Sequence, residues 1–386
     1  MPLPTILQPH KNMDQIWIFT DHLLDPPYLR MVFSFLGAFL IVWFSIPSII
    51  RTSRQKGLLY IPNERSSHAG AVPDLGGIAL FAGIVIPSLI FLYSGNLRGI
   101  QFLIAGIIII FMVGIKDDVS GLTPWAKLIG QIIACLVLIL PGNLILTNLH
   151  GFLTIGPIQP EFGTILTLFV MIVIINSINL IDGIDGLAGG LSLVVFITYG
   201  VWFYLAGQYV LAIISTACIG SLIAFLYFNV FGKEHQIFMG DAGSLVLGFI
   251  IAFFSILFNQ LNIDPNIPNH VTSAPSVSMA ILVIPLYDTI RIFVLRLLKG
   301  QSPFTPDHSH VHHILIGLGL SHRMAALVLI LFNIGCIILA FCLSKLGVSV
   351  IKMVLILLLL CFAGAESLHQ LEKRKGRRTA GVKCEM

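Results

Sequence analysis

The chain has 386 residues, of which 56% are hydrophobic and only 10% are charged, and its mean hydropathy is +0.95. A soluble globular protein carries about 25% charged residues, so this composition excludes that class and predicts an integral membrane protein. The net charge of +4 is modest and indicates a basic cytoplasmic face, with no nucleic acid as a partner.

About eleven apolar runs are long enough to cross the hydrocarbon core as helices of about 20 residues. They lie near 31–50, 75–94, 98–115, 127–147, 163–180, 187–206, 209–229, 243–260, 277–298, 324–344 and 346–365. We therefore predict an all-α fold, a polytopic transmembrane helical bundle of about 11 spans over residues 31–365. Residues 1–30 are expected to be a polar extracytoplasmic segment that is not a cleaved signal peptide, and residues 366–386 a basic cytoplasmic tail.

Lysine and arginine residues are concentrated on one side of these runs. With the N-terminus outside, the inner side holds Arg51, Arg54, Lys56, Arg65, Lys116, Lys127, Lys233, Lys299, Arg323 and the tail, whereas the outer side holds only Lys11, Arg30, Arg98 and Lys345. Positive charge favours the cytoplasmic side. We therefore expect a multi-pass protein of the cell inner (plasma) membrane, with the lipid bilayer as its surroundings.

Five polar stretches occur at the inner ends of the runs, where ionisable residues beside lipid normally mark function. The first contains Arg65 and His68, followed by Gly76 and Gly77 at the start of the second run. These residues are equally compatible with an ordinary loop and helix start.

The second stretch contains Asp117 and Asp118, followed by Lys127. Two adjacent carboxylates repel each other, so they require a nearby cation, either a lysine or a metal ion. The alternative is an interfacial pair that is simply solvated.

The third stretch is the densest in acids and amides, and consists of Asn176, Ser177, Asn179, Asp182, Gly183, Asp185 and Gly186. If it is helical, Asn179, Asp182 and Gly183 fall on one face. Carboxylate and amide oxygens are hard ligands that suit Mg²⁺.

The fourth stretch, from Phe238 to Ser244, places Asp241 between glycines at a predicted helix start. Backbone N–H groups at such a start favour anions, although Asp241 or Ser244 could serve only as a helix cap.

The fifth stretch contains His308, His310, His312 and His313. A zinc site is conceivable, but HxHxHH is not a standard zinc spacing, and the six scattered cysteines form no CxxC pair. Imidazoles that contact phosphate or position a nucleotide fit as well. Acids, amides, lysine and histidines beside lipid suit chemistry that joins a soluble anionic substrate to a membrane-bound one.

In order and spacing, five segments resemble the polyprenyl-phosphate N-acetylhexosamine-1-phosphate transferase superfamily. They are RSSHAGAVPDLGG, KDDVSGLTPWAKLIGQ, NSINLIDGIDGLAGG, FMGDAGSLVLG and PFTPDHSHVHH. The HxHH form of the last segment is similar to that of the initiators, the superfamily members that start a glycan by transferring GlcNAc-1-phosphate. The resemblance implies that undecaprenyl phosphate attacks a UDP-N-acetylhexosamine, with UDP-GlcNAc as the expected donor, and releases UMP to start a lipid-linked cell-surface glycan. His308 stands where initiators often carry Arg or Lys, which leaves the sugar open among GlcNAc, GalNAc and a 6-deoxy hexosamine.

The resemblance also implies roles for individual residues at a site that faces the cytoplasm. Mg²⁺, with Mn²⁺ as an alternative ion, is expected on Asp241, with Asn179 as a candidate second ligand. The expected catalytic acids are Asp117 and Asp118, which engage the lipid phosphate, and Asp182 and Asp185, near the nucleotide and metal. The expected substrate contacts are Arg65, His68, Lys127, Phe238, His310, His312 and His313. The resemblance allows a homodimer.

A membrane transporter for an anionic substrate is the main rival, because transporters also carry polar residues within their spans. Asp288 and Arg291 are the most transporter-like feature, but their spacing of three favours an ion pair on one helix face. A non-catalytic membrane scaffold would not need the acids of the third stretch.

Overall fold

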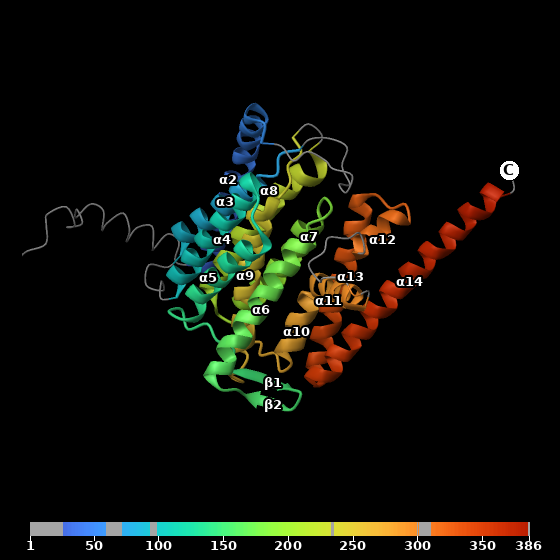
Figure 1. Ribbon diagram of the computed structural model, residues 1–386. Coiled ribbons are helices and arrows are strands. Elements are labelled where there is room, and N and C mark those ends of the chain that lie inside the picture. Colours follow the sequence, from blue (N-terminus) through green and yellow to red (C-terminus); the bar gives the residue numbers. More distant parts are fainter. Residues whose placement is uncertain are drawn as a thin grey trace, which may run out of the picture.

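The computed structural model describes residues 26–58, 72–92, 99–232, 235–298, 300 and 310–384, and within them the chain is almost entirely helical (Figure 1). The first helices are α2 (Pro27–Lys56), α3 (Gly76–Phe91), α4 (Ile100–Ser120), α5 (Pro124–Ile139), α6 (Pro160–Leu180), α7 (Leu187–Leu205) and α8 (Tyr209–Leu226), which continues into the π-helical turn η2 (Tyr227–Phe231). They are followed by α9 (Gly240–Leu261), α10 (Ala274–Ile281), α11 (Val283–Leu298), α12 (Val311–Gly317), α13 (His322–Lys345) and α14 (Val350–Cys384).

The predicted all-α membrane bundle is confirmed for the part of the chain that the structure describes. There, eight helices are long and apolar enough to cross a membrane, α10 and α11 together form one bent candidate span, and α3 and α5 are shorter apolar helices. These segments correspond to the eleven predicted runs. A short antiparallel hairpin of β1 (Asn148–Phe152) and β2 (Ile155–Pro157) lies in the connection between α5 and α6.

The ninth predicted span is not one straight helix, because α10 and α11 meet at an angle of 80°. Pro285 explains the break: in a continuous helix its ring would clash with the carbonyl of Ile281, the last residue of α10. The side chain of Asn333 on α13 binds both sides of the break. Its amide nitrogen donates to the Ile281 carbonyl at 3.1 Å, and its oxygen accepts from the Ile284 N–H at 3.4 Å. Exposed backbone groups at this depth are therefore satisfied within the protein.

Helix α9 is the centre of the bundle: 89% of the residues in its apolar stretch are buried within the protein, compared with 22% for the peripheral helix α14. It packs against α3, α4 and α6. Two glycines allow this packing at the polar end of α9. A Cβ on Gly77 would lie 2.2 Å from the backbone nitrogen of Gly243, and one on Gly114 would lie 2.3 Å from the Cα of Ala242. Small residues bring helix backbones together in this way in membranes.

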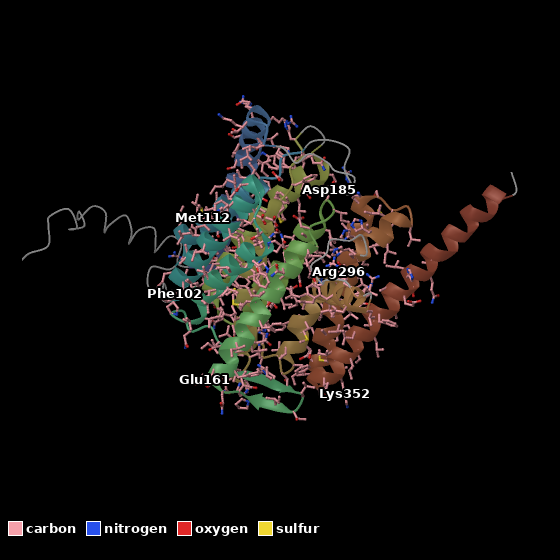
Figure 2. All side chains as sticks on the ribbon, viewed as in Figure 1. Phe102, Met112, Glu161, Asp185, Arg296 and Lys352 are labelled. Atoms are coloured by element: carbon pink, nitrogen blue, oxygen red, sulfur yellow. The ribbon has the colours of Figure 1, made fainter. Side chains whose placement is uncertain are left out.

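The two ends of the bundle differ in chemistry. Glu161 and Lys352 lie at the end that carries the hairpin, whereas Asp185 lies toward the opposite end (Figure 2). The connection between α6 and α7, which contains Asp185, and the start of α9 both belong to the predicted inner side. The fold thus gathers the polar stretches of distant helices toward one end.

Candidate active site

A lysine surrounded by three oxygen atoms lies where α4, α5, α6 and α9 meet. The Nζ atom of Lys127 is 2.6 Å from Asp241 Oδ1, 3.0 Å from Asp117 Oδ2 and 3.3 Å from Asn179 Oδ1. Asp117, Asn179 and Asp241 lie 10, 52 and 114 positions from Lys127 in the sequence, so the lysine on α5 joins residues of three other helices. The second, third and fourth polar stretches therefore form one cluster.

The adjacent carboxylates of α4 have different partners. Asp117 binds Lys127 and also accepts the backbone N–H of Leu122 at 2.7 Å. Asp118 accepts the N–H groups of Asp241 and Ala242, at 2.6 and 3.0 Å, and so caps the start of α9. A lysine supplies the cation that the sequence analysis required for this pair, and a helix N-terminus stabilises the second charge.

The start of α9 is held by the backbone of the segment before α3. The N–H of Phe238 donates to the Pro73 carbonyl at 2.8 Å, and the Phe238 carbonyl accepts from Gly76 at 3.0 Å. Gly240 has a φ of 70° and approaches so closely that a Cβ would lie 2.0 Å from the Asp74 carbonyl oxygen. Glycine is required there. The glycine-rich sequence thus fixes the position of Asp241.

Asn179 connects the acid cluster to the first turn of α9. Its amide nitrogen donates to Asp241 Oδ1 and to Ser244 Oγ, the latter at 2.8 Å, while Ser244 also donates to the Gly240 carbonyl. Ser244 is therefore part of the cluster and does not cap α9. The side chains of Asn176 and Gln131 form a reciprocal amide pair one turn deeper, at 2.8 and 3.2 Å.

The third polar stretch is not one continuous helix, so Asn179, Asp182 and Gly183 do not share a helical face: α6 ends at Leu180 and α7 begins at Leu187. The connection turns at Gly186, which has a φ of 79° and whose N–H binds Asn229 Oδ1 at 2.8 Å. Burial, together with the negative charges of Asp241, Asp185 and Asp118, raises the pKa of Asp182 to about 7. Asp182 therefore faces the same cluster from a turn.

Asp185 lies farther along this turn, at the polar end of the bundle. It accepts a hydrogen bond from Gln236 Nε2 at 3.0 Å. Burial raises the pKa of Asp185 to about 6, although the charges of His322 and Arg323 oppose the increase. The carboxylate is thus half-ionised at about pH 6 and mostly charged at pH 7.

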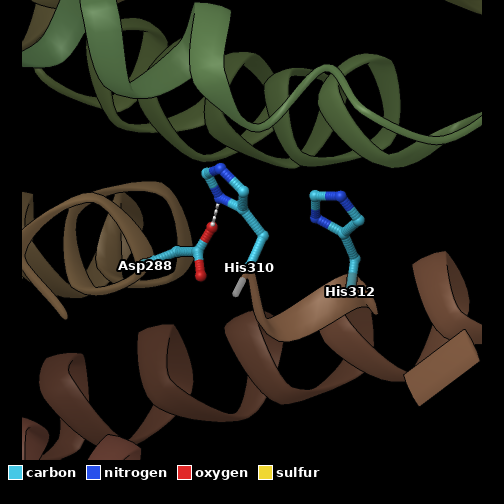
Figure 3. Close-up of side chains that lie close together, drawn as sticks. All are labelled: Asp288, His310 and His312. Carbon is cyan, nitrogen blue, oxygen red and sulfur yellow. Dashed lines mark hydrogen bonds and ion pairs between the residues drawn. The ribbon is translucent and has the colours of Figure 1, made fainter. Parts of the chain in front are cut away.

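The histidines of the fifth stretch pack against α11 and against the turn after α6. His310 Nδ1 is 2.7 Å from Asp288 Oδ2, and Asp288 Oδ1 accepts the Val311 N–H at 2.9 Å (Figure 3). His312 is fully buried, and a Cβ on Gly183 would lie 2.7 Å from its Nε2 atom. Burial, together with the neighbouring His313, lowers the pKa of His312 to about 3, so the ring is neutral.

The structure brings together most of the predicted site residues. The acid cluster contains Asp117, Asp118, Lys127, Asn179, Asp182 and Asp241, with Asp185, Phe238 and the histidines around it. Arg65 and His68 lie outside the described residues, as does His308. The catalytic, metal and substrate roles assigned to all of these residues stay predictions.

Asp288 is a partner of the histidines that its sequence spacing does not reveal. The spacing pairs Asp288 only with Arg291, whereas both carboxylate oxygens have partners in the segment that begins at His310. An ionisable residue within an apolar run was the available signal. The partner could not be read from spacing, because it is 22 positions away.

A multi-pass helical bundle with a cluster of four acids, an amide and one lysine at one end defines a membrane protein built to bind a charged ligand beside lipid. Residues 100–259 match the family model described as glycosyl transferase family 4. The chain is 37% identical over 314 residues to the undecaprenyl-phosphate alpha-N-acetylglucosaminyl 1-phosphate transferase of Haemophilus influenzae, covering 80% of this chain and 84% of the relative.

Proteins with the same name from two other bacteria are also similar. The Pasteurella multocida protein is 38% identical, covering 78% of this chain and 82% of the relative. The Escherichia coli K12 protein is 31% identical, covering 71% of this chain and 73% of the relative. The chain belongs to glycosyl transferase family 4, and the resemblance inferred from its five segments is confirmed.

Proposed function

We propose that this protein transfers N-acetylhexosamine-1-phosphate, with UDP-GlcNAc as the first donor to test, to undecaprenyl phosphate in the plasma membrane. The observation that carries the proposal is the contact of one ammonium group with oxygens of Asp117, Asn179 and Asp241. This cluster lies at the end of the bundle where the basic loops are predicted, and the relatives are named for the same transfer. The active site accordingly faces the cytoplasm.

The acid cluster fits a magnesium ion. Its oxygens already surround a positive charge, and a carboxylate with an amide oxygen is a donor set that Mg²⁺ accepts together with water and substrate phosphate. Asp241 and Asn179 would hold the ion, with Asp182 close by. Bound there, Mg²⁺ would neutralise charge that develops on the diphosphate.

In this reaction an oxygen of the lipid phosphate forms a bond to the β-phosphorus of the donor, and the bond from that phosphorus to the bridging oxygen of UMP breaks. Asp117 is the carboxylate that we assign to the lipid phosphate as its proton acceptor, because its partner Lys127 is a flexible side chain that can move to a phosphate oxygen. Asp118 instead holds the α9 backbone. Lys127, once exchanged, would donate to a phosphate oxygen.

The test is release of UMP from a panel of UDP-hexosamines by the purified full-length chain. Release is expected only when polyprenyl phosphate and Mg²⁺ are both present, and EDTA should stop it. Mn²⁺ added after EDTA tests the alternative ion. No UMP from any donor in the panel would contradict the proposal, and uptake of a UDP-sugar into vesicles without UMP release would favour the transporter alternative.

A further inference from the structure

A buried amide on α13 lies at the bend between α10 and α11. Asn333 is fully buried, and its side chain donates to the Ile281 carbonyl at 3.1 Å and accepts from the Ile284 N–H at 3.4 Å. In a helix that continued through this point, the N–H groups of residues 284 and 285 would bond to the carbonyls of residues 280 and 281. Asn333 therefore supplies, from another helix, a donor and an acceptor that a straight span would find within itself.

The roles of Pro285 and Asn333 at the bend are different. Pro285 prevents a continuous helix, but a proline does not by itself set the direction in which the chain leaves the break. Asn333 binds one backbone group on each side of the break, so it fixes α10 and α11 relative to each other and to α13. Within the bilayer there is no water to which these backbone groups could transfer their bonds. The angle of 80° therefore depends on this amide.

The segment that follows the bend leads directly to a residue of the candidate active site. Asp288 lies four residues after Ile284, one helical turn farther along α11. Its Oδ1 accepts the Val311 N–H at 2.9 Å, and its Oδ2 lies 2.7 Å from His310 Nδ1 (Figure 3). The direction of α11 thus sets the position of the segment that carries the histidines.

The histidines connect this segment to the acid cluster. The rings of His310 and His312 are stacked, with centroids 5.4 Å apart. The His312 ring is buried against Gly183, where a Cβ would lie 2.7 Å from its Nε2 atom. Gly183 is next to Asp182, which faces the acid cluster. The described contacts therefore lead from Asn333 to the active site through packed side chains and backbone.

A small change in the bend angle would be large at the site. Asp288 lies five residues beyond Val283, where α11 begins, which is about 7.5 Å along the helix axis. A change of about 10° at the bend would move Asp288 by about 1.3 Å. A misplacement of about 1 Å can lower a reaction rate by about 100-fold where the reacting groups must be aligned.

We propose that Asn333 is a positioning residue for the transfer reaction. It holds the bend between α10 and α11 at the angle that keeps Asp288 and the histidines against the active site. This role rests on the proposed function. In the described contacts Asn333 binds only backbone groups of the bend, so it acts through α11 and not on substrate.

The first variant of the test is Asn333→Leu, made in the full chain and purified in detergent. It removes both hydrogen bonds and keeps a side chain of similar size. We expect a lower melting temperature and a kcat/KM for UMP release about 10- to 100-fold below that of the unmodified chain. Diethyl pyrocarbonate, which modifies accessible imidazoles, reports the histidines directly after peptide mapping by mass spectrometry. His312 is buried in the unmodified chain and should react several-fold faster in the variant.

Asn262→Leu is the matched control. Asn262 is also a buried amide that binds two backbone groups, donating to the Phe258 carbonyl at 2.8 Å and accepting from the Val271 N–H at 2.6 Å. It lies just beyond the end of α9 that is opposite Asp241. This variant should also lower the melting temperature, but it should keep the kcat/KM and the slow modification of His312. The comparison separates position from stability.

A double variant, Asn333→Leu with Pro285→Ala, separates the bend from the lost hydrogen bonds. Without the proline ring, the helix can continue and satisfy the backbone groups that Asn333 binds. We expect a melting temperature above that of Asn333→Leu. The kcat/KM should stay low and His312 should stay reactive, because α11 now points elsewhere. This variant decides the result if Asn333→Leu does not fold.

Two results would overturn the proposal. One is an Asn333→Leu protein with the kcat/KM and the His312 protection of the unmodified chain. The other is a double variant with full activity, which would show that a straight span serves equally well. If the unmodified chain releases no UMP, the proposed function fails, but the modification rate of His312 still shows whether Asn333 holds the histidines in place. The two failures are therefore distinguishable.

Discussion

The acid cluster and the histidine cluster, which consists of Asp288, His310 and His312, differ in how far the protein supplies partners for their polar groups. Around Lys127, each carboxylate and amide has a partner within the protein, so a positive charge is already present where a cation is expected. At His312, the surrounding protein supplies no described hydrogen-bond partner for a buried ring. The first arrangement can exchange an internal cation for substrate and metal, and the second is completed only by an added ligand.

The largest effect is expected from Asp241→Ala, which tests whether the acid cluster is the reaction centre. The change removes the carboxylate shared by Lys127 and Asn179 and should lower the rate of UMP release by about 1,000-fold or more. Asp264→Ala is the control, because this exposed acid lies beyond the other end of α9. Full activity of a correctly inserted Asp241→Ala protein would remove Asp241 from the site.

Lys127→Met tests the internal cation itself. Loss of the ammonium leaves Asp117 and Asp241 without their shared counterion, and we expect UMP release to fall about 100-fold. Lys127→Arg keeps the charge but changes the geometry, so it should recover only part of the rate. The rates are measured over a range of Mg²⁺ concentrations. Equal rates for Met and Arg at every concentration would show that the charge of Lys127 is not used.

The acid cluster could be predicted from sequence because its residues are ionisable groups at the ends of apolar runs. Lipid makes such residues rare, so Asp117, Lys127 and Asp241 stand out without any knowledge of their contacts. The pairing could not be predicted, since the choice between Asp117 and Asp118 as the partner of Lys127 depends on where α9 begins.

The histidines of the histidine cluster could be predicted from sequence, but their partner Asp288 could not, because the contact depends on how distant helices pack. The sequence shows four histidines close together, but Asp288 reaches them because α11 starts anew after Pro285 and α12 returns to it. The apolar run 277–298 predicted one straight span here. Asn333, which satisfies the backbone at the bend, is a polar residue within another apolar run, and its spacing does not identify Ile281 and Ile284 as its partners.

Gly183→Ala tests whether the two clusters are mechanically connected. The added methyl group would lie 2.7 Å from His312 Nε2, so the ring must move away from the turn that carries Asp182. We expect UMP release to fall several-fold, because the ring that must move is an expected substrate contact. Gly156→Ala in the hairpin has nothing within 4 Å of the new Cβ and should not change the rate. An unchanged rate of UMP release from Gly183→Ala would show that the position of His312 is not used in the transfer.

The smallest effect concerns Asp185, which lies on the connection between α6 and α7 and has a pKa raised to about 6 from its ordinary 3.8. The folded protein therefore keeps this proton at pH values where the unfolded chain has lost it. The contribution of Asp185 to stability is greatest below pH 3.8 and is lost as the pH rises through 6. Asp185→Asn removes this dependence, so its apparent melting temperature should gain about 1–3 °C on the unmodified protein between pH 5 and pH 7. The two proteins are compared in one detergent at one heating rate. Parallel melting curves across this range would mean that Gln236, His322 and Arg323 stabilise the charged carboxylate enough to cancel the cost of its burial.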